Sequence, residues 1–412
     1  MIESRKLANG VRIVVEKIPT VRSVSLGIWV GTGSRNESQQ NNGISHFIEH
    51  MMFKGTHTYN AKQIAEIFDG IGGQINALTS KEYTCYYAKV IDQHFDLALD
   101  VLSDMFFNSK FEAAEIDKER GVILEELYMY EDTPDDLVHD LISRASFGDH
   151  PLGYAILGTK PVLESVNRQM ITEYMDATYT AGNTVITIAG NVESDVFEKV
   201  AALFEKMAAK NIEQKPNNIE LLAEKIVVNK STEQAHICLA NKGYSVGHEN
   251  THALAIINNI MGGSMSSRLF QEIREERGMA YSVYSYHSAY ADNGMYVSYI
   301  GTSPKHVDEA LKIIKKVYRD MYESGITAEE LHKAKEQLKG MLTLSLESTT
   351  SRMNRLGKNE LLLHRQISLD ETIEKIEQVT LEQTKQVCEE IFAETGALAA
   401  IGPFDDIEFG RE

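Results

Sequence analysis

The chain has 412 residues, of which 43% are hydrophobic, enough to form two or more hydrophobic cores. Its formal charge of −19 argues against a nucleic-acid-binding protein, because phosphate binding needs a face rich in lysine and arginine. We find no run of about 20 apolar residues and no signal-peptide core at the start, so we expect neither a membrane span nor secretion.

The first predicted elements form a β-hairpin and then a series of separate strands and helices. Residues Lys6 to Glu16 alternate between apolar and polar around Asn9-Gly10, a dipeptide that favours a type I′ hairpin turn. The elements predicted after it are a strand over 23–30, helices over 44–53 and 61–68, and strands over 73–79 and 83–91.

The second half of the chain repeats this order of elements about 210 residues later. Between the halves, a polar segment that contains Pro216 breaks both periodicities and is interpreted as a linker. We predict an α+β protein of two homologous domains, over 1–207 and 227–412, joined by a linker over 208–226, each with a mainly antiparallel sheet packed against helices. The matched elements are strand 234–240 for 23–30, helix 253–261 for the helix at 44–53, and strand 281–290 for 83–91.

The most informative motif is His46-Phe47-Ile48-Glu49-His50. On a helix, about 100° per residue places the two histidines one turn apart on the same face, with Glu49 at its edge. Two imidazoles and a carboxylate in this order are the ligand pair and general base of an inverted-motif zinc hydrolase. We therefore expect His46 and His50 to bind zinc and Glu49 to act as the base.

A catalytic zinc ion takes a third protein ligand, and the best candidates lie in the acidic helical stretch from Glu115 to Glu131. Glu119 and Glu126 are seven residues apart and share a face, so Glu126 would bind the metal and Glu119 would orient the site. Spacing alone does not separate Glu126 from its neighbour Glu125.

The alternative interpretation of the motif is a pair of surface histidines beside a glutamate. The matching helix of the second half argues against it, because residues Ile256, Asn259 and Ile260 stand there instead and cannot bind a metal. A purely structural requirement of this helix would apply to both copies.

These residues resemble the pitrilysin/insulinase family of zinc peptidases, and most closely its bacterial branch that is similar to the mitochondrial processing peptidases. In that family the histidine motif is followed, some 75 residues later, by a glutamate ligand within the segment E-R-x-V-I-x-x-E, which is present here from Glu119 to Glu126. The resemblance implies that Glu126, rather than Glu125, is the third ligand and that Glu119 is the accessory glutamate. It covers essentially the whole chain.

The resemblance implies further site residues. Gly73 to Thr79 looks like the edge strand on which the family holds its substrate, with Asn76 and Ala77 as the named positions. Arg274 and Tyr281 resemble a pair that stabilises the reacting carbonyl. Asp136 and Asp140 resemble acidic positions that accept a substrate arginine in the processing peptidases. The alternative interpretation of these two residues is a solvated acidic face.

Long members of the family carry four such domains in one chain and this sequence carries two, so the resemblance implies a homodimer around an enclosed chamber. We expect one Zn²⁺ per chain and peptide substrates. Three scattered cysteines, at 85, 238 and 388, suit a reducing compartment, and we expect the protein in the cytoplasm. The alternative function is a non-catalytic or partner-dependent assembly subunit of the same fold.

Overall fold

The computed structural model describes residues 2–210, 219–394 and 396–407, and it confirms the predicted α+β class. The chain divides into two compact units, each with one sheet and its helices. The first unit comprises residues 1–128, 154–215 and 345–366, and the second comprises 129–153, 216–344 and 367–412. The predicted linker over 208–226 falls partly outside the described residues, and its Pro216 lies there.

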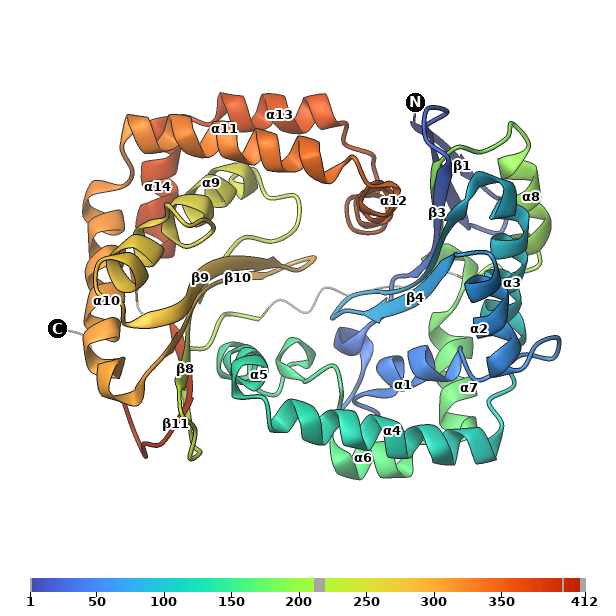
Figure 1. Cartoon of the computed structure of the whole chain (residues 1–412), viewed down its shortest axis with the longest axis horizontal. Helices are drawn as coiled ribbons and strands as arrows, with labels where there is room; N and C mark the ends of the chain where they lie inside the picture. The colour runs from blue at the N-terminus through green and yellow to red at the C-terminus, as the bar shows by residue number, and fades with distance from the viewer. Residues whose placement is uncertain (1, 211–218, 395, 408–412) are drawn as a thin grey trace. The chain divides into compact units, whose positions relative to one another are not determined.

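The first unit contains a six-stranded sheet, three strands of which, β1, β3 and β4, are labelled in Figure 1. The order of its strands is β1-β2-β6-β3-β5-β4. All neighbouring strands are antiparallel except β2 and β6, which are parallel. The central strand β3 is buried on both faces, which explains its nearly continuous apolar sequence. The strands are β1 (Ile2–Lys6), β2 (Arg12–Lys17), β3 (Ser23–Val30), β4 (Gln74–Thr79), β5 (Thr84–Ile91) and β6 (Thr184–Gly190).

The predicted hairpin forms between β1 and β2, but the predicted type I′ turn is wrong. A type I′ turn needs two consecutive residues with positive φ. Here Gly10 has a positive φ, of 108°, but the φ of Asn9 is not positive. The Leu7 amide donates to the Val11 carbonyl across a three-residue loop. The Asn9 side chain instead donates to the carbonyl of Phe204, 2.9 Å away, so a tertiary contact selects the turn.

The second unit contains a five-stranded sheet in the order β7-β11-β8-β10-β9, again with one parallel pair, β7 and β11. Position and pairing match β8 with β3, β10 with β5 and β9 with β4. The predicted match of 281–290 with 83–91 is therefore wrong, because that segment forms the edge strand β9. The strands are β7 (Lys225–Asn229), β8 (Ala235–Lys242), β9 (Ala280–Ala289), β10 (Gly294–Thr302) and β11 (Ala397–Gly402).

Helices pack against both sheets. Those of the first unit are α1 (Ile44–Met51), α2 (Ala61–Gly70), α3 (Phe95–Asn108), most of α4 (Ala113–Glu131), α6 (Lys160–Ser165), α7 (Arg168–Thr178), α8 (Val196–Phe204) and α12 (Thr349–Lys358). Those of the second unit are α5 (Pro134–Phe147), α9 (Thr251–Met261), α10 (Val307–Ser324), nearly all of α11 (Ala328–Ser345), α13 (Leu369–Gln378) and α14 (Leu381–Ile391).

The two units differ from the predicted halves by an exchange of helices. Helix α12, from late in the sequence, lies beside β3 of the first unit (Figure 1) and packs against β3 and β6. There Met353 and Leu356 belong to the same buried cluster as the ring of Trp29. Helix α5, from the first half, packs against β8 and β11 of the second unit through Val138 and Ile142. Each sheet therefore has one face completed by a helix from the other half of the sequence.

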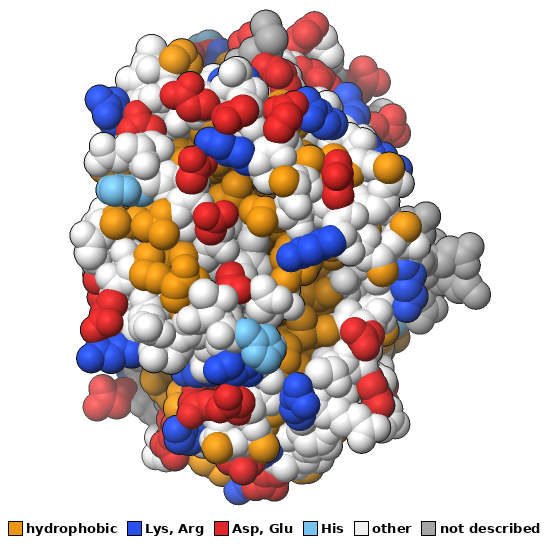
Figure 2. Space-filling model, turned by 90° about the vertical axis from the view of Figure 1, so that its right-hand side faces the viewer, with side chains coloured by type: hydrophobic (Ala, Val, Ile, Leu, Met, Phe, Trp, Pro, Cys, Tyr) orange, Lys and Arg blue, Asp and Glu red, His pale blue; other side chains and the backbone are white. Residues whose placement is uncertain are grey.

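On the face that Figure 2 shows, acidic and basic side chains are interspersed, and hydrophobic side chains are exposed between them. Charges of one sign are not segregated on this face. Within the described ranges, every helix is too short or too polar to cross a lipid bilayer.

Candidate metal centre

Helix α1, which carries the histidine motif, has its first turn capped by a carboxylate from outside the helix. Its N-cap residue, Gly43, has φ of 97°, and a Cβ there would lie 2.7 Å from a backbone oxygen. The carboxylate of Glu37 supplies the missing cap: it accepts hydrogen bonds from the amides of Gly43 (2.7 Å) and Ser45 (2.8 Å) and from the Asn42 side chain (2.9 Å). Burial raises the pKa of Glu37, and these hydrogen bonds oppose the rise. Glu37 thus anchors the start of the helix that aims both histidines.

The structure brings His46, His50 and Glu126 together, with one potential ligand atom of each within 4.8 Å of the others. Glu126 Oε2, from α4, lies 3.4 Å from His50 Nε2 and 3.9 Å from His46 Nε2. The neighbouring Glu125 is exposed, as expected for a side chain about 100° further round the same helix.

The three side chains fit a catalytic zinc ion. Zinc binds imidazole nitrogen at about 2.0–2.1 Å and carboxylate oxygen at about 2.0–2.2 Å, so tetrahedral ligand atoms lie about 3.3 Å apart. The Glu126–His50 spacing of 3.4 Å matches this value, and the Glu126–His46 spacing of 3.9 Å is somewhat longer. Burial, and secondarily the neighbouring His50, lowers the pKa of His46 to about 3, so its imidazole is neutral as a ligand must be. The Glu126 side chain is 35% exposed, which leaves the cluster open to water and substrate on one side.

Glu119 lies behind His50, on the same face of α4 as Glu126. The Nδ1 of His50 is 2.7 Å from Glu119 Oε1, and the Glu119 side chain is only 6% exposed. A histidine that donates from Nδ1 to a carboxylate presents Nε2 as the ligand atom, so this contact selects the tautomer that the metal requires. By contrast, Nδ1 of His46 is buried without a hydrogen-bond partner among the described residues.

Glu49 lies beside the three ligands, held by a residue of the edge strand. The hydroxyl of Thr79, at the end of β4, donates to Glu49 Oε2 at 2.5 Å. Burial raises the pKa of Glu49, the Thr79 hydrogen bond and His50 lower it, and Glu126 raises it. A buried carboxylate with a raised pKa is well suited to accept and return a proton near neutral pH.

Strand β4, which carries the predicted substrate positions Asn76 and Ala77, lies at one edge of the first sheet and pairs with β5. Asn76 is exposed, and its side-chain oxygen accepts a hydrogen bond from the Ala77 amide at 2.8 Å. Because Thr79 ends this same strand, the sheet edge leads directly to Glu49.

The remaining predicted site residues belong to the second unit. Arg274 lies in a π-helical segment, its guanidinium 4.6 Å from the ring centre of Tyr281, and it donates to the Tyr281 carbonyl at 2.8 Å. The Tyr281 side chain is strongly exposed, at 77%. Asp136 and Asp140 lie one turn apart on α5, and the Asp136 carbonyl accepts a hydrogen bond from Tyr130.

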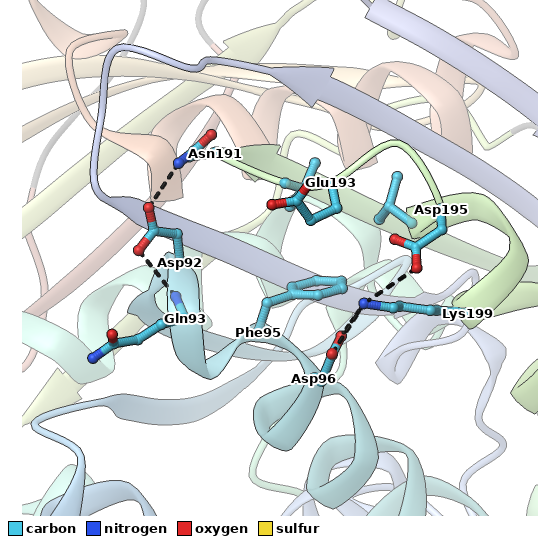
Figure 3. Close-up of a pocket in the computed structure, with 10 residues that line it drawn as sticks. Asp92, Gln93, Phe95, Asp96, Asn191, Glu193, Asp195 and Lys199 are labelled. Atoms are coloured by element: carbon cyan, nitrogen blue, oxygen red, sulfur yellow. Dashed lines mark hydrogen bonds and ion pairs between the residues drawn. The ribbon is translucent and has the colours of Figure 1, made fainter.

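A separate hollow of about 340 Å³ lies in the first unit, where β5 and β6 end (Figure 3). Lys199 of α8 lies 2.8 Å from Asp96 of α3 and 3.5 Å from Asp195, and Asp92 accepts a hydrogen bond from the neutral side chain of Asn191 at 2.6 Å. The Lys199–Asp96 contact joins α8 to the start of α3, and the Asn191–Asp92 contact joins the residues that follow β6 and β5.

Sequence reasoning missed three residues around the cluster: Glu37, Lys54 and Thr79. Lys54 contacts Glu119 at 2.6 Å. Two signals were present, since Lys54 follows His50 by four residues and Thr79 ends a predicted strand. No local pattern indicates that Glu37 caps a helix that begins seven residues later.

Comparison with known proteins gives consistent results. Residues 12–160 match the model of the insulinase family (peptidase family M16), and residues 165–338 match the family's inactive domain. An uncharacterized zinc protease of Bacillus subtilis is 52% identical over 98% of both chains, and one of Streptomyces coelicolor is 40% identical over 98% of this chain and 90% of its own. Among solved structures, a peptidase M16 inactive domain of Pseudomonas fluorescens has a TM-score of 0.92 at 20% identity, covering 98% of both chains. A protease of Helicobacter pylori has a TM-score of 0.90 at 22% identity, covering 98% of this chain and 99% of its own.

Proposed function

This chain belongs to the insulinase family of peptidases (peptidase family M16), and on that premise we propose that it is a zinc-dependent endopeptidase of oligopeptides or unfolded segments. The observation that carries the proposal is the convergence of His46, His50 and Glu126 with Glu49 beside them. These are three ligands and a base, which is what a zinc hydrolase needs from its protein.

In the proposed reaction, His46, His50 and Glu126 would hold the zinc ion. When bound, zinc supplies Lewis acidity that activates a water molecule and polarises a carbonyl. Glu49 accepts the proton from the attacking water and delivers it to the leaving amine. Thr79 holds one oxygen of that carboxylate in place during both transfers.

The substrate would lie along β4 as an added strand, with main-chain hydrogen bonds to the region of Asn76 and Ala77. The edge position of β4 supports this placement, as does the contact between Thr79 and Glu49, which brings a peptide on that edge towards the base. Binding through the main chain would accept many sequences.

Two further roles in the proposal rest on the family resemblance. Arg274 and Tyr281 would stabilise the oxyanion, and the exposed side chain of Tyr281 supports this role. Asp136 and Asp140 would favour substrates with a basic residue near the cleavage site. If so, Asp136→Asn combined with Asp140→Asn weakens cleavage of arginine-containing peptides selectively, whereas equal loss on neutral peptides contradicts the pocket.

We also propose that two chains assemble as a homodimer around the cleavage chamber, with one zinc ion per chain. The three cysteines are unpaired, which supports the proposal of a reducing, cytoplasmic location.

Zinc stoichiometry combined with cleavage of a peptide library tests the proposal. We expect one zinc per chain in the purified protein, and we expect Glu49→Gln to retain the metal but lose cleavage. Glu126→Gln should lose zinc, whereas the matched control Glu125→Gln should keep it. A folded protein without zinc would instead support the non-catalytic subunit, and a zinc-loaded protein without activity would support a partner-dependent peptidase.

A further inference from the structure

The buried carboxylate of Glu119 is shared between two side chains of the motif segment. Its Oε1 lies 2.7 Å from His50 Nδ1, and its Oε2 lies 2.6 Å from Lys54 Nζ. The side chain of Glu119 is 6% exposed and that of Lys54 is 29% exposed. Both oxygens of one carboxylate are therefore engaged, one by a proposed zinc ligand and the other by a cation.

The backbone after α1 explains how Lys54 reaches this position. The turn of the helix continues beyond Met51, because the Phe53 amide donates to the His50 carbonyl at 3.2 Å and the Lys54 amide to the Met51 carbonyl at 3.1 Å. The contacts of both side chains with Glu119 show that His50 and Lys54 face α4. Gly55, with φ of 113°, then ends the turn.

We propose that Lys54 is a positioning residue for the metal centre, acting through Glu119 on His50. This inference rests on the proposed zinc site. An ammonium group on Oε2 offsets the cost of burying the carboxylate and fixes its rotation, so that Oε1 receives the His50 Nδ1 proton. The imidazole is then held in the tautomer and orientation that direct Nε2 towards Glu126 and His46.

The effect is specific to one of the two histidine ligands. His46 has its Nδ1 buried without a hydrogen-bond partner among the described residues, so its orientation depends on packing. His50 is 22% exposed and depends on Glu119, which in turn depends on Lys54. Loss of Lys54 should therefore weaken zinc binding without removing any ligand.

Zinc affinity, measured by competition with a chromophoric chelator, tests the inference without relying on activity. We expect Lys54→Met to weaken zinc binding about 10- to 100-fold, the range found when partners behind a metal ligand are removed. Lys54→Arg, which keeps a cation, should recover most of that affinity. Lys118→Met is the matched control, because Lys118 makes a similar ion pair with Glu115 on the exposed side of α4, and it should bind zinc as the wild type does.

A double-mutant cycle shows whether Lys54 acts through Glu119. In the Glu119→Gln background, Lys54→Met should cause no further loss of affinity. The inference is overturned if Lys54→Met binds zinc within twofold of the wild type, or if the two losses multiply. Thermal unfolding of the chelator-treated proteins identifies a misfolded variant, in which case Lys54→Gln replaces it. A wild-type protein without zinc would refute the proposed function instead.

Discussion

Replacing Thr79 with valine removes one hydroxyl and leaves the shape of the side chain almost unchanged. That hydroxyl donates to the carboxylate of Glu49 at 2.5 Å, a hydrogen bond to a charged acceptor. Such bonds contribute about 1.5–3 kcal/mol. Since each 1.36 kcal/mol changes a rate about tenfold, kcat/KM should fall about 10- to 100-fold, with zinc still bound.

The same substitution should change the pH profile. The Thr79 hydrogen bond lowers the pKa of Glu49 against the opposing effect of burial, so its removal raises that pKa further. Glu49 must be ionised to accept a proton, and therefore the acidic limb of the profile should move to higher pH.

Peptide cleavage across a pH series, with zinc content measured on the same samples, provides the assay. Thr79→Ser retains the hydroxyl and should retain most of the activity. Thr172→Val removes a hydroxyl that donates to the Arg168 and Gln169 carbonyls of its own helix, α7, and it should have no effect. Unchanged kcat/KM and an unmoved acidic limb in Thr79→Val would refute the role given to this contact.

Three further predictions concern stability. Gly357→Ala would place a Cβ 2.2 Å from the Trp29 ring and should lower the free energy of unfolding by about 1–3 kcal/mol, measured by denaturant unfolding with Trp29 fluorescence. The control Gly340→Ala, which has open space around its Cβ, should raise that free energy by about 0.5–1 kcal/mol, and equal effects of the two substitutions would contradict the packing argument. Glu37→Ala leaves three donors at the start of α1 without their acceptor and should cost about 3 kcal/mol in the same assay, with a cost below about 1 kcal/mol as the contrary result. Burial lowers the pKa of His287 to about 4, so as pH falls this histidine is protonated in the unfolded chain before it is protonated in the folded protein. The free energy of unfolding should therefore drop by up to about 3 kcal/mol between pH 6.5 and 4, and His287→Gln should lose that part of the pH dependence.

The features that sequence could predict are those encoded by local periodicity. The helix with His46 and His50, the acidic helix with Glu126, and the edge strand before Thr79 each follow from a short pattern of apolar and polar positions. The choice of Glu126 over Glu125 needed the family resemblance, because both lie in the same helix and only packing decides which one faces inward.

The features that escaped prediction depend on contacts between distant residues. Lys54 and Glu119 are 65 positions apart, and Thr79 contacts Glu49 from a different element. A short stretch of sequence, such as that used to predict a helix or a strand, therefore contains neither pair. The turn at Asn9 was misassigned for the same reason, because its side chain bonds to Phe204. Amphipathic helices α5 and α12 could be predicted as helices, but their apolar faces do not reveal which sheet they cover.

The position of α12 has a consequence for the order of events during synthesis. The strands of the first sheet are complete at Gly190, whereas the helix that covers Trp29 begins at Thr349. At roughly 5–20 residues per second, the ribosome needs about 8–30 s to produce the intervening segment. During that interval the apolar face of β3 and β6 around Trp29 stays exposed, so this part of the first core can close only after α12 has been synthesised.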